Sequence, residues 1–189
     1  MIKYAISGNI ASGKSTVENI LKSLGFAVAD TDVIAHNLLE NNQEVIKAFK
    51  DYDILTGGKI SREKLGKLVF NNQNLKKKLE NILHPQIKQK VNEFFEENKN
   101  KDKVFVSVPL LFEANMQGMF DKIIFVYTND DIRLQRLMLR NNYTKEYALI
   151  RINSQLSQQK KIKKCDFVIY NNSSLEDLEK SVKNLVPKL

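Results

Sequence analysis

Short apolar segments alternate with segments of helical periodicity at the start of the chain. Residues 3–7 form an apolar run that predicts a buried strand, and a glycine-containing loop follows it. Apolar residues then recur at helical spacing up to Gly25, which can end the helix, and a second apolar run at 26–29 leads to Asp30. A strand, a glycine loop, a helix and a second strand in this order are typical of the opening of a doubly wound α/β domain.

Residues 33–99 show mostly the periodicity of helices. Ser61 precedes one apolar repeat and is predicted to cap that helix at its amino end. Residues 75–83 predict a further helix, and residues 87–95 another. We expect the first of these two to end before Pro85, because proline lacks the N–H that a helix interior needs and disfavours the helical conformation of the residue before it.

Strand signals return in the second half of the chain, and helical segments separate them. The predicted strands lie at residues 104–108, 123–127 and 167–170, and the predicted helices at 130–140, 145–155 and 175–186. Strands that alternate with helices predict a parallel sheet covered by helices.

The composition favours a globular protein without a membrane span. The 189 residues fit one compact domain, and 42% hydrophobic with 28% charged residues is ordinary for such a protein. The single cysteine, Cys165, excludes an internal disulfide and a cysteine-based zinc site. The first apolar run is too short for a signal peptide and no apolar stretch is long enough to cross a membrane, so we expect a cytoplasmic protein.

The formal net charge is +8, and the lysines that produce it are spread along the chain. We interpret most of this charge as a solvated, lysine-rich surface. Attraction to nucleic acid or to phosphate-rich small molecules is the alternative that the charge leaves open.

Residues 8–15 fit the phosphate-binding motif G-x-x-x-x-G-K-[ST], between a predicted strand and a predicted helix. The chemistry needs this spacing because backbone N–H groups wrap the phosphates, glycines allow positive φ, and the helix dipole favours anions. Lys14 is predicted to reach the β- and γ-phosphates of ATP, and the Ser15 hydroxyl to bind Mg²⁺. The residues predicted to hold the nucleotide here are Gly8, Ala11, Ser12, Gly13, Lys14, Ser15 and Thr16.

Two aspartates, Asp30 and Asp32, follow the second predicted strand. Ligands of open α/β sheets bind beyond the carboxyl ends of the strands, so a carboxylate there can accept a proton from an attacking hydroxyl or bind Mg²⁺. The alternative is that the aspartates only cap the next helix. Because two of them follow a strand that we expect next to the strand of the phosphate loop, we favour a functional role.

Residues 30–36, Asp-Thr-Asp-Val-Ile-Ala-His, resemble the Asp-Ala-Asp-x-Ile signature of dephospho-CoA kinases. Five further segments resemble elements of that family, in the same order along the chain. They are Leu83-His84-Pro85 and residues 108–113, 136–140, 151–155 and 166–171. The resemblance therefore covers nearly the whole chain.

Five positions depart from the family pattern. Asn9 and Ala11 stand where the family loop usually has glycine, and Thr31 replaces an alanine. Arg133 stands where glutamine is frequent, and Ser107 where an aspartate often precedes the Val-Pro-Leu-Leu element. The last departure weakens the case for a metal-binding carboxylate on the strand at 104–108.

The resemblance implies a three-layer α/β fold of the P-loop NTPase type, with a five-stranded parallel sheet in a single kinase domain. By this resemblance the core comprises residues 1–34, 96–130 and 159–189, a helical insertion at 35–95 binds the substrate, and residues 131–158 form a helical lid. The implied reaction converts ATP and dephospho-CoA to ADP and CoA, the last step of coenzyme A synthesis. We expect no nucleic-acid or membrane partner, and a monomer or a weak homo-oligomer.

The resemblance also implies roles for single residues. Asp32, Lys14 and Arg140 would be catalytic, with Asp32 accepting the proton of the substrate 3′-hydroxyl. Arg136 would join Arg140 in binding the transferred phosphate from the lid, because residues four apart share a helix face. A solvated basic helix face is the alternative for both arginines, and it is our interpretation of Arg133.

Three further residues have structural alternatives. His84 and Leu111 would contact the substrate, although His84 could be a structural residue at a helix boundary and Leu111 a core residue. Asn171 would lie near the adenine of the nucleotide, with a turn position as the alternative.

Two other classes of function remain as rivals. Another small-molecule or nucleoside monophosphate kinase would share the loop and the lid but not the full series of motifs. A GTP-dependent switch should carry Asn-Lys-x-Asp, and the segment Asn98-Lys99-Asn100-Lys101 fails that pattern. No aromatic-rich basic segment or helix-turn-helix signal supports a nucleic-acid-binding module.

Overall fold

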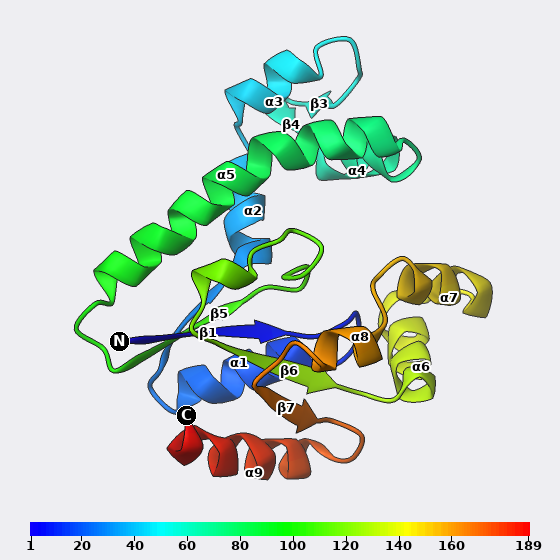
Figure 1. The fold of residues 1–189 in the computed structure, drawn as a ribbon. Coiled ribbons are helices and arrows are strands. Elements are labelled where there is room, and N and C mark those ends of the chain that lie inside the picture. Colours follow the sequence, from blue (N-terminus) through cyan, green and yellow to red (C-terminus); the bar gives the residue numbers. More distant parts are fainter. The chain divides into compact units, whose positions relative to one another are not determined.

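The computed structural model describes residues 1–189, and the chain forms two compact units (Figure 1). One unit comprises Met1–Asp30 and Glu97–Leu189, and it contains the main sheet. The other comprises Thr31–Glu96 and is mostly helical. We refer to them as the sheet unit and the helical unit.

The sheet unit is built on five parallel strands in the order β2-β5-β1-β6-β7. Their bounds are β1 (Ile2–Ser7), β2 (Ala27–Asp30), β5 (Lys103–Ser107), β6 (Lys122–Tyr127) and β7 (Phe167–Tyr170). Each strand lies within two residues of its predicted position, and the predicted five-stranded parallel sheet of an α/β P-loop fold is confirmed.

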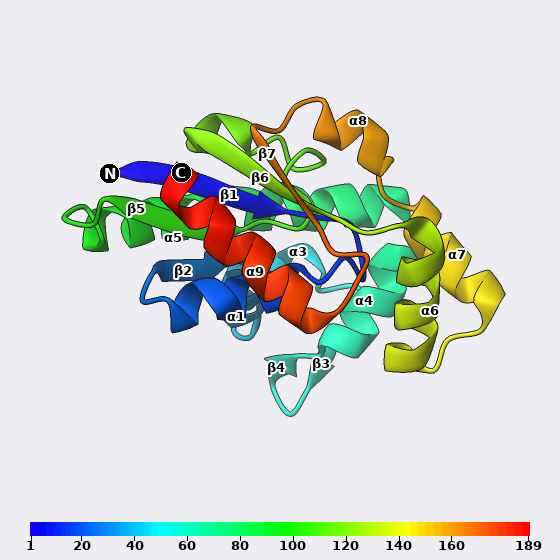
Figure 2. The same ribbon diagram turned by 90° about the horizontal axis from the view of Figure 1, so that it is seen from below.

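Helices lie on both sides of this sheet (Figures 1 and 2). Helices α1 (Lys14–Ser23) and α9 (Leu175–Leu185) pack side by side on one face, and α8 (Gln158–Ile162) lies against β6 on the other. The remaining helices of this unit are α6 (Asp130–Asn141) and α7 (Lys145–Asn153), with two short 3₁₀ turns at Gln117–Met119 and Val186–Lys188. Helix α8 lies in a segment where no helix is predicted from the sequence.

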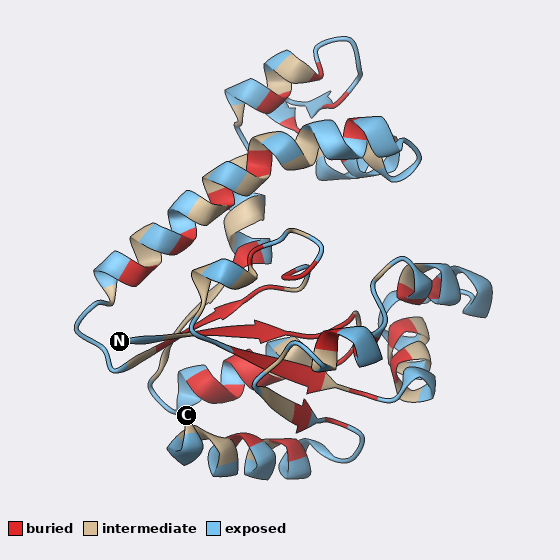
Figure 3. Ribbon diagram, viewed as in Figure 1, coloured by how far each residue is buried: buried red, intermediate tan, exposed pale blue.

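The main core lies between the sheet and the pair α1 and α9. Figure 3 shows that β1, β5 and β6 are buried along most of their length. Tyr4 and Phe105 stack there with ring centroids 5.1 Å apart, and apolar side chains of both helices cover them. Burial of this apolar surface is the main term that holds the strands in register.

The strand register brings the carboxyl ends of all five strands to one edge of the sheet. Ser107 pairs with Ile6 on one side and with Asp30 on the other, and Tyr127 pairs with Tyr170. The loops that follow the strands therefore meet at the edge where the phosphate loop begins. This is the edge at which open α/β sheets bind ligands.

Helices α6 and α7 form a hairpin with a small core of its own. Leu137, Ala148 and Ile152 are buried between the two helices, while Leu139 and Ile150 are exposed. A hairpin with few buried apolar residues is a segment of low local stability, as a closing lid requires. The lid at 131–158 stays a prediction.

The helical unit contains four helices and a small hairpin. Their bounds are α2 (Thr31–Leu39), α3 (Gln43–Ala48), β3 (Leu55–Thr56), β4 (Lys59–Ile60), α4 (Arg62–Phe70) and α5 (Gln73–Glu97), the last of which ends one residue beyond the unit. Ser61 caps α4 as predicted, because its side chain accepts a hydrogen bond from the Lys64 N–H at 3.4 Å. Gly57 and Gly58 join β3 to β4 with φ of 58° and 79°, a conformation that glycine adopts without strain.

The predicted helix end before Pro85 is wrong. Helix α5 runs for 25 residues with Pro85 in its interior. The buried apolar stripe continues across the proline, with Leu83 before it and Ile87 and Val91 after it. Burial of this stripe outweighs the single backbone hydrogen bond that the proline removes. No helix of the protein has both the length and the hydropathy needed to cross a membrane.

Pro85→Ala should stabilise the protein, because alanine adds the missing N–H and removes the ring from the helix interior. We expect the free energy of unfolding to rise by about 1–3 kcal/mol, measured by urea denaturation. Lys77→Ala, at an exposed position of the same helix, is the control and should change stability little. A loss of stability in Pro85→Ala would show that the proline is needed for the shape of α5.

Candidate active site

The phosphate loop leaves β1 at Gly8 and enters α1 at Lys14. Gly13 has a φ of 87°, and a Cβ at this position would lie 2.1 Å from Asn171 Nδ2. A Cβ on Gly8 would lie 2.5 Å from Ser12 Oγ and 2.9 Å from the Val126 carbonyl oxygen. Both motif positions therefore need glycine for steric reasons, as a loop that wraps phosphates closely requires.

The carbonyl group of Ser12 anchors the loop to the sheet. It accepts one hydrogen bond from Thr128 Oγ1 at 2.9 Å and another from Asn171 Nδ2 at 2.8 Å. Thr128 and Asn171 are buried and directly follow β6 and β7. The structure thus places the Asn171 side chain against the loop backbone, and its contact with adenine stays a prediction. The sequence analysis does not single out Thr128, although its position directly after a predicted strand is typical of residues that lie at a ligand site.

The first half of the loop is held by residues of α6 and of the segment that follows α7. The Ile10 N–H donates to Gln155 Oε1 at 2.8 Å, and the Ile10 carbonyl accepts from Arg133 Nε at 2.9 Å. Asn9 Nδ2 donates to the Leu156 carbonyl at 2.9 Å. Because α6 and the segment after α7 both bind this backbone, the loop is held by hydrogen bonds from the α6–α7 side as well as from the ends of the strands.

The interpretation of Arg133 as part of a solvated helix face is wrong. Only 1% of the residue is exposed, and Nη1 lies 2.7 Å from Asp130 Oδ1. Burial lowers the pKa of the Arg133 guanidinium, and the neighbouring Asp130 opposes this shift. Helical spacing identifies which residues share a face, but it does not say what covers that face.

The two other arginines of α6 have different surroundings. Arg136 is half-buried beside the loop, with Nη1 3.9 Å from the point that a Cβ on Gly13 would occupy. Arg140 is exposed, and its Nε donates to Asn141 Oδ1 at 2.9 Å. The structure therefore brings Arg136 to the phosphate loop and leaves Arg140 at the exposed end of the helix.

Lys14 lies beside a buried carboxylate. Its Nζ is 2.9 Å from Glu18 Oε1 and also donates to Ser107 Oγ, and Ser107 Oγ donates to the same Glu18 oxygen at 2.5 Å. Only 3% of Glu18 is exposed. Glu18 lies outside the phosphate-loop motif, so the motif does not predict its contact with Lys14. Its position four residues after Lys14 is nevertheless the spacing of a helical ion pair.

The metal chemistry of the site rests on few protein ligands. Ser15, the predicted Mg²⁺ ligand, lies exposed in the first turn of α1. No group of three or more histidine, cysteine or acidic side chains in residues 1–189 forms a metal site. These donors fit Mg²⁺ that arrives with nucleotide phosphates and retains several waters, because such an ion needs only one or two protein ligands.

The family model of dephospho-CoA kinases matches residues 2–177 of the chain. The chain belongs to the dephospho-CoA kinase family. Its relatives named dephospho-CoA kinase include one from Listeria monocytogenes, 39% identical over 97% of this chain and 94% of the relative. Another, from Fusobacterium nucleatum, is 43% identical over 94% of this chain and 93% of the relative.

Solved structures agree with this membership of the dephospho-CoA kinase family. A dephospho-CoA kinase from Campylobacter jejuni superposes with a TM-score of 0.77 at 36% identity, covering 98% of this chain and 96% of that one. A Thermus thermophilus protein reaches 0.85 at 34% identity, covering 100% and 97%. A shikimate kinase from Acinetobacter baumannii, at 15% identity and a TM-score of 0.54 over 100% and 94%, shares the fold alone.

The remaining predicted residues of this family member lie on both units. Asp32 is exposed in the first turn of α2, two residues after the end of β2. His84 is partly buried in α5, and this burial lowers the pKa of its imidazole, against the opposing charge of Glu80. Leu111 is fully buried in the loop that follows β5. This burial fits the alternative that Leu111 is a core residue.

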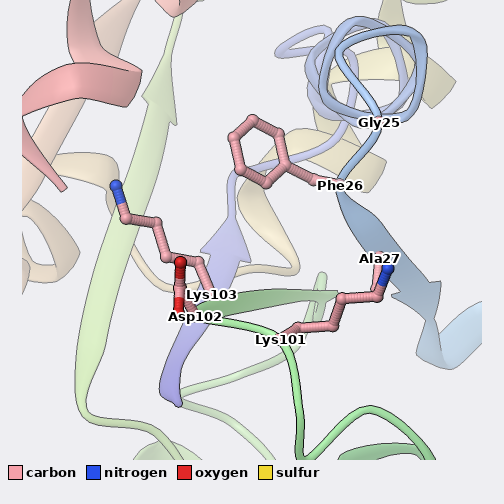
Figure 4. Close-up of a pocket in the computed structure, with 6 residues that line it drawn as sticks. All are labelled: Gly25, Phe26, Ala27, Lys101, Asp102 and Lys103. Atoms are coloured by element: carbon pink, nitrogen blue, oxygen red, sulfur yellow. The ribbon is translucent and has the colours of Figure 1, made fainter.

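An open depression of about 280 Å³ lies at the opposite edge of the sheet, at the amino ends of β2 and β5 (Figure 4). Its lining consists of Gly25, Phe26, Ala27, Lys101, Asp102 and Lys103. No residue of the phosphate loop contributes to it. The depression is therefore no part of the candidate active site.

Gly13→Ala and Gly25→Ala should differ in nucleotide binding, because both glycines have a φ near 86° but only a Cβ on Gly13 meets other atoms. Both variants should lose about 1 kcal/mol of stability from the left-handed backbone. Gly13→Ala should also displace Asn171 and weaken ADP binding about tenfold or more, measured by calorimetry. Equal losses of ADP affinity in the two variants would contradict the steric account of the loop.

Proposed function

We propose that this protein transfers the γ-phosphoryl group of ATP to the ribose 3′-hydroxyl of dephospho-CoA and so completes coenzyme A synthesis. The match to the dephospho-CoA kinase family over residues 2–177 is the observation that carries the proposal. The phosphate loop supports it, because its glycines, its anchored Ser12 carbonyl and Lys14 are in place at the carboxyl edge of the sheet.

The loop and the start of α1 bind the nucleotide phosphates in this proposal. Backbone N–H groups from Gly8 to Thr16 surround the β- and γ-phosphates, and the Lys14 ammonium pairs with their oxygens. Ser15 would hold Mg²⁺, which neutralises charge on the β- and γ-phosphates when it is bound. Asn171 keeps the loop in shape through its hydrogen bond to the Ser12 carbonyl, and it would also contact the adenine.

Asp32 acts on the acceptor. As the bond between the substrate 3′-oxygen and Pγ forms, the bond from Pγ to the β,γ-bridging oxygen breaks, and ADP is the leaving group. The 3′-hydroxyl proton passes to the Asp32 carboxylate. Because the transition state of phosphoryl transfer is loose, the position and the charge of the binding groups contribute more than the strength of this base.

The lid arginines neutralise the transferred group. Arg136 already lies beside Gly13, so it needs little movement to reach a phosphate in the loop. Arg140 is exposed, and its catalytic role requires movement of the α6–α7 hairpin. On the acceptor side, His84 with a lowered pKa would bind a substrate hydroxyl or amide as a neutral imidazole.

The first test measures ADP release from ATP and magnesium with dephospho-CoA, and with adenosine, AMP and shikimate as comparison acceptors. We expect turnover only with dephospho-CoA. Lys14→Ala should lower the rate about a hundredfold or more because it removes the cation at the phosphates, and Asp32→Asn should lower it because the proton acceptor is lost. Turnover with another acceptor alone would leave a kinase of this fold but refute the proposed substrate.

Arg133→Met and Arg136→Met should separate anchoring of the loop from binding of phosphate. Arg133→Met leaves the Ile10 carbonyl without its donor, so the free energy of unfolding should fall by about 1–3 kcal/mol. Arg136→Met should retain stability and lose about tenfold or more in kcat/KM for ATP. Urea denaturation and steady-state kinetics of both variants provide the measurement, and exchanged effects would contradict the assignment.

A further inference from the structure

Glu18 is a buried acid beside the lysine of the phosphate loop, at a position that the loop motif leaves open. It lies one helical turn after Lys14 on α1, and its side chain is 5% exposed. Its Oε1 receives a hydrogen bond from Lys14 Nζ at 2.9 Å and one from Ser107 Oγ at 2.5 Å. The two partners of the carboxylate are therefore the lysine of the loop and the last residue of β5.

Burial of both side chains distinguishes this ion pair from the other ion pairs within helices of the protein. Lys180 and Glu176 on α9 have the same four-residue spacing and a distance of 2.9 Å, but their side chains are 64% and 76% exposed. Exposed pairs of this kind contribute little to the stability of a protein. A buried carboxylate needs its partners, so the fixed geometry of Glu18 also fixes Lys14.

The Lys14 ammonium has three N–H donors. Glu18 and Ser107 each accept one of them, which leaves one N–H for the nucleotide phosphates. An ammonium with two fixed hydrogen bonds cannot rotate or swing as a surface lysine does. Such preorganised charge is the main means by which an active site stabilises developing charge in a transition state.

We propose that Glu18 is a positioning residue for phosphoryl transfer, which acts by holding the Lys14 ammonium in place together with Ser107. This inference rests on the proposed use of ATP by the phosphate loop. The Glu18 carboxylate also carries the same sign of charge as the phosphates and repels them. Glu18 therefore weakens binding of the nucleotide in its ground state while it raises the rate of the transfer.

Glu18→Gln tests both effects, since glutamine keeps the size of the side chain and removes the charge. We expect ADP to bind about threefold more tightly, measured by calorimetry without magnesium and without acceptor. We expect kcat with ATP and dephospho-CoA to fall about tenfold or more. Glu176→Gln removes a carboxylate from an exposed pair and is the matched control, which should change neither quantity.

A double variant tests whether Glu18 acts through Lys14. In the Lys14→Ala background, Glu18→Gln should not lower the remaining rate any further, because the residue that it positions is gone. A loss of the same size in both backgrounds would overturn the proposal. An ADP affinity and a kcat within twofold of the wild type in Glu18→Gln would overturn it as well.

The position of Ser107 allows a rescue that a merely structural role would not give. Ser107 Oγ contacts both Lys14 Nζ and Glu18 Oε1, so a carboxylate at position 107 would lie beside the same ammonium. Glu18→Ala should lose kcat, and Glu18→Ala with Ser107→Asp should recover most of that loss. Failure to recover activity in a double variant that still binds ADP would contradict the proposal.

The proposed function and the proposed role of Glu18 can be refuted separately. If the wild-type protein does not phosphorylate dephospho-CoA, the proposed function fails. The ADP affinities of the wild type, Glu18→Gln and Glu176→Gln then still decide the role of Glu18, because that measurement needs no acceptor. If the wild type is fully active, an ADP affinity and a kcat that both stay within twofold of the wild type in Glu18→Gln refute only the role of Glu18.

Discussion

The hydrogen bonds to the Ser12 carbonyl are the constraint on which the rest of the site depends. Thr128 and Asn171 donate them from the ends of two strands, so the loop keeps its shape only while β6 and β7 are in register with β1. The left-handed conformation of Gly13 lets the backbone pass close to the Asn171 amide. A parallel sheet with a buried core thereby becomes a rigid support for a loop of backbone donors, which is the form that phosphate binding needs.

The same loop also receives hydrogen bonds from the α6–α7 side of the molecule. Arg133 and Gln155 bind the two backbone groups of Ile10, so movement of the hairpin acts on the loop through these contacts. The hairpin has only a small core around Leu137 and Ala148, which is typical of a segment of low local stability. If the hairpin closes as a lid, as the sequence predicts, these direct contacts would couple that closure to the phosphate loop without a longer pathway.

The sequence predicted the parts of this protein that depend on local pattern. The phosphate-loop motif, the five strands and the cap of α4 follow from spacing and from residue type, and the structure has all of them. The continuation of α5 through Pro85 could not be predicted, because packing of a long apolar stripe outweighs a local preference. The burial of Arg133 and the position of Glu18 beside Lys14 could not be predicted either, because the packing that buries a charged side chain is a property of the folded chain. For Asn171, the sequence predicted a place near the adenine, which stays a prediction, and did not predict the hydrogen bond to the Ser12 carbonyl.

The chemical identity of the product tests the central claim most directly. Phosphorus NMR of the mixture formed from ATP, magnesium, dephospho-CoA and the protein separates a new phosphomonoester from free phosphate. We expect one new phosphomonoester, at the ribose 3′-position, in an amount equal to the ADP released. ADP accompanied only by inorganic phosphate, or a phosphomonoester at another hydroxyl, would contradict it.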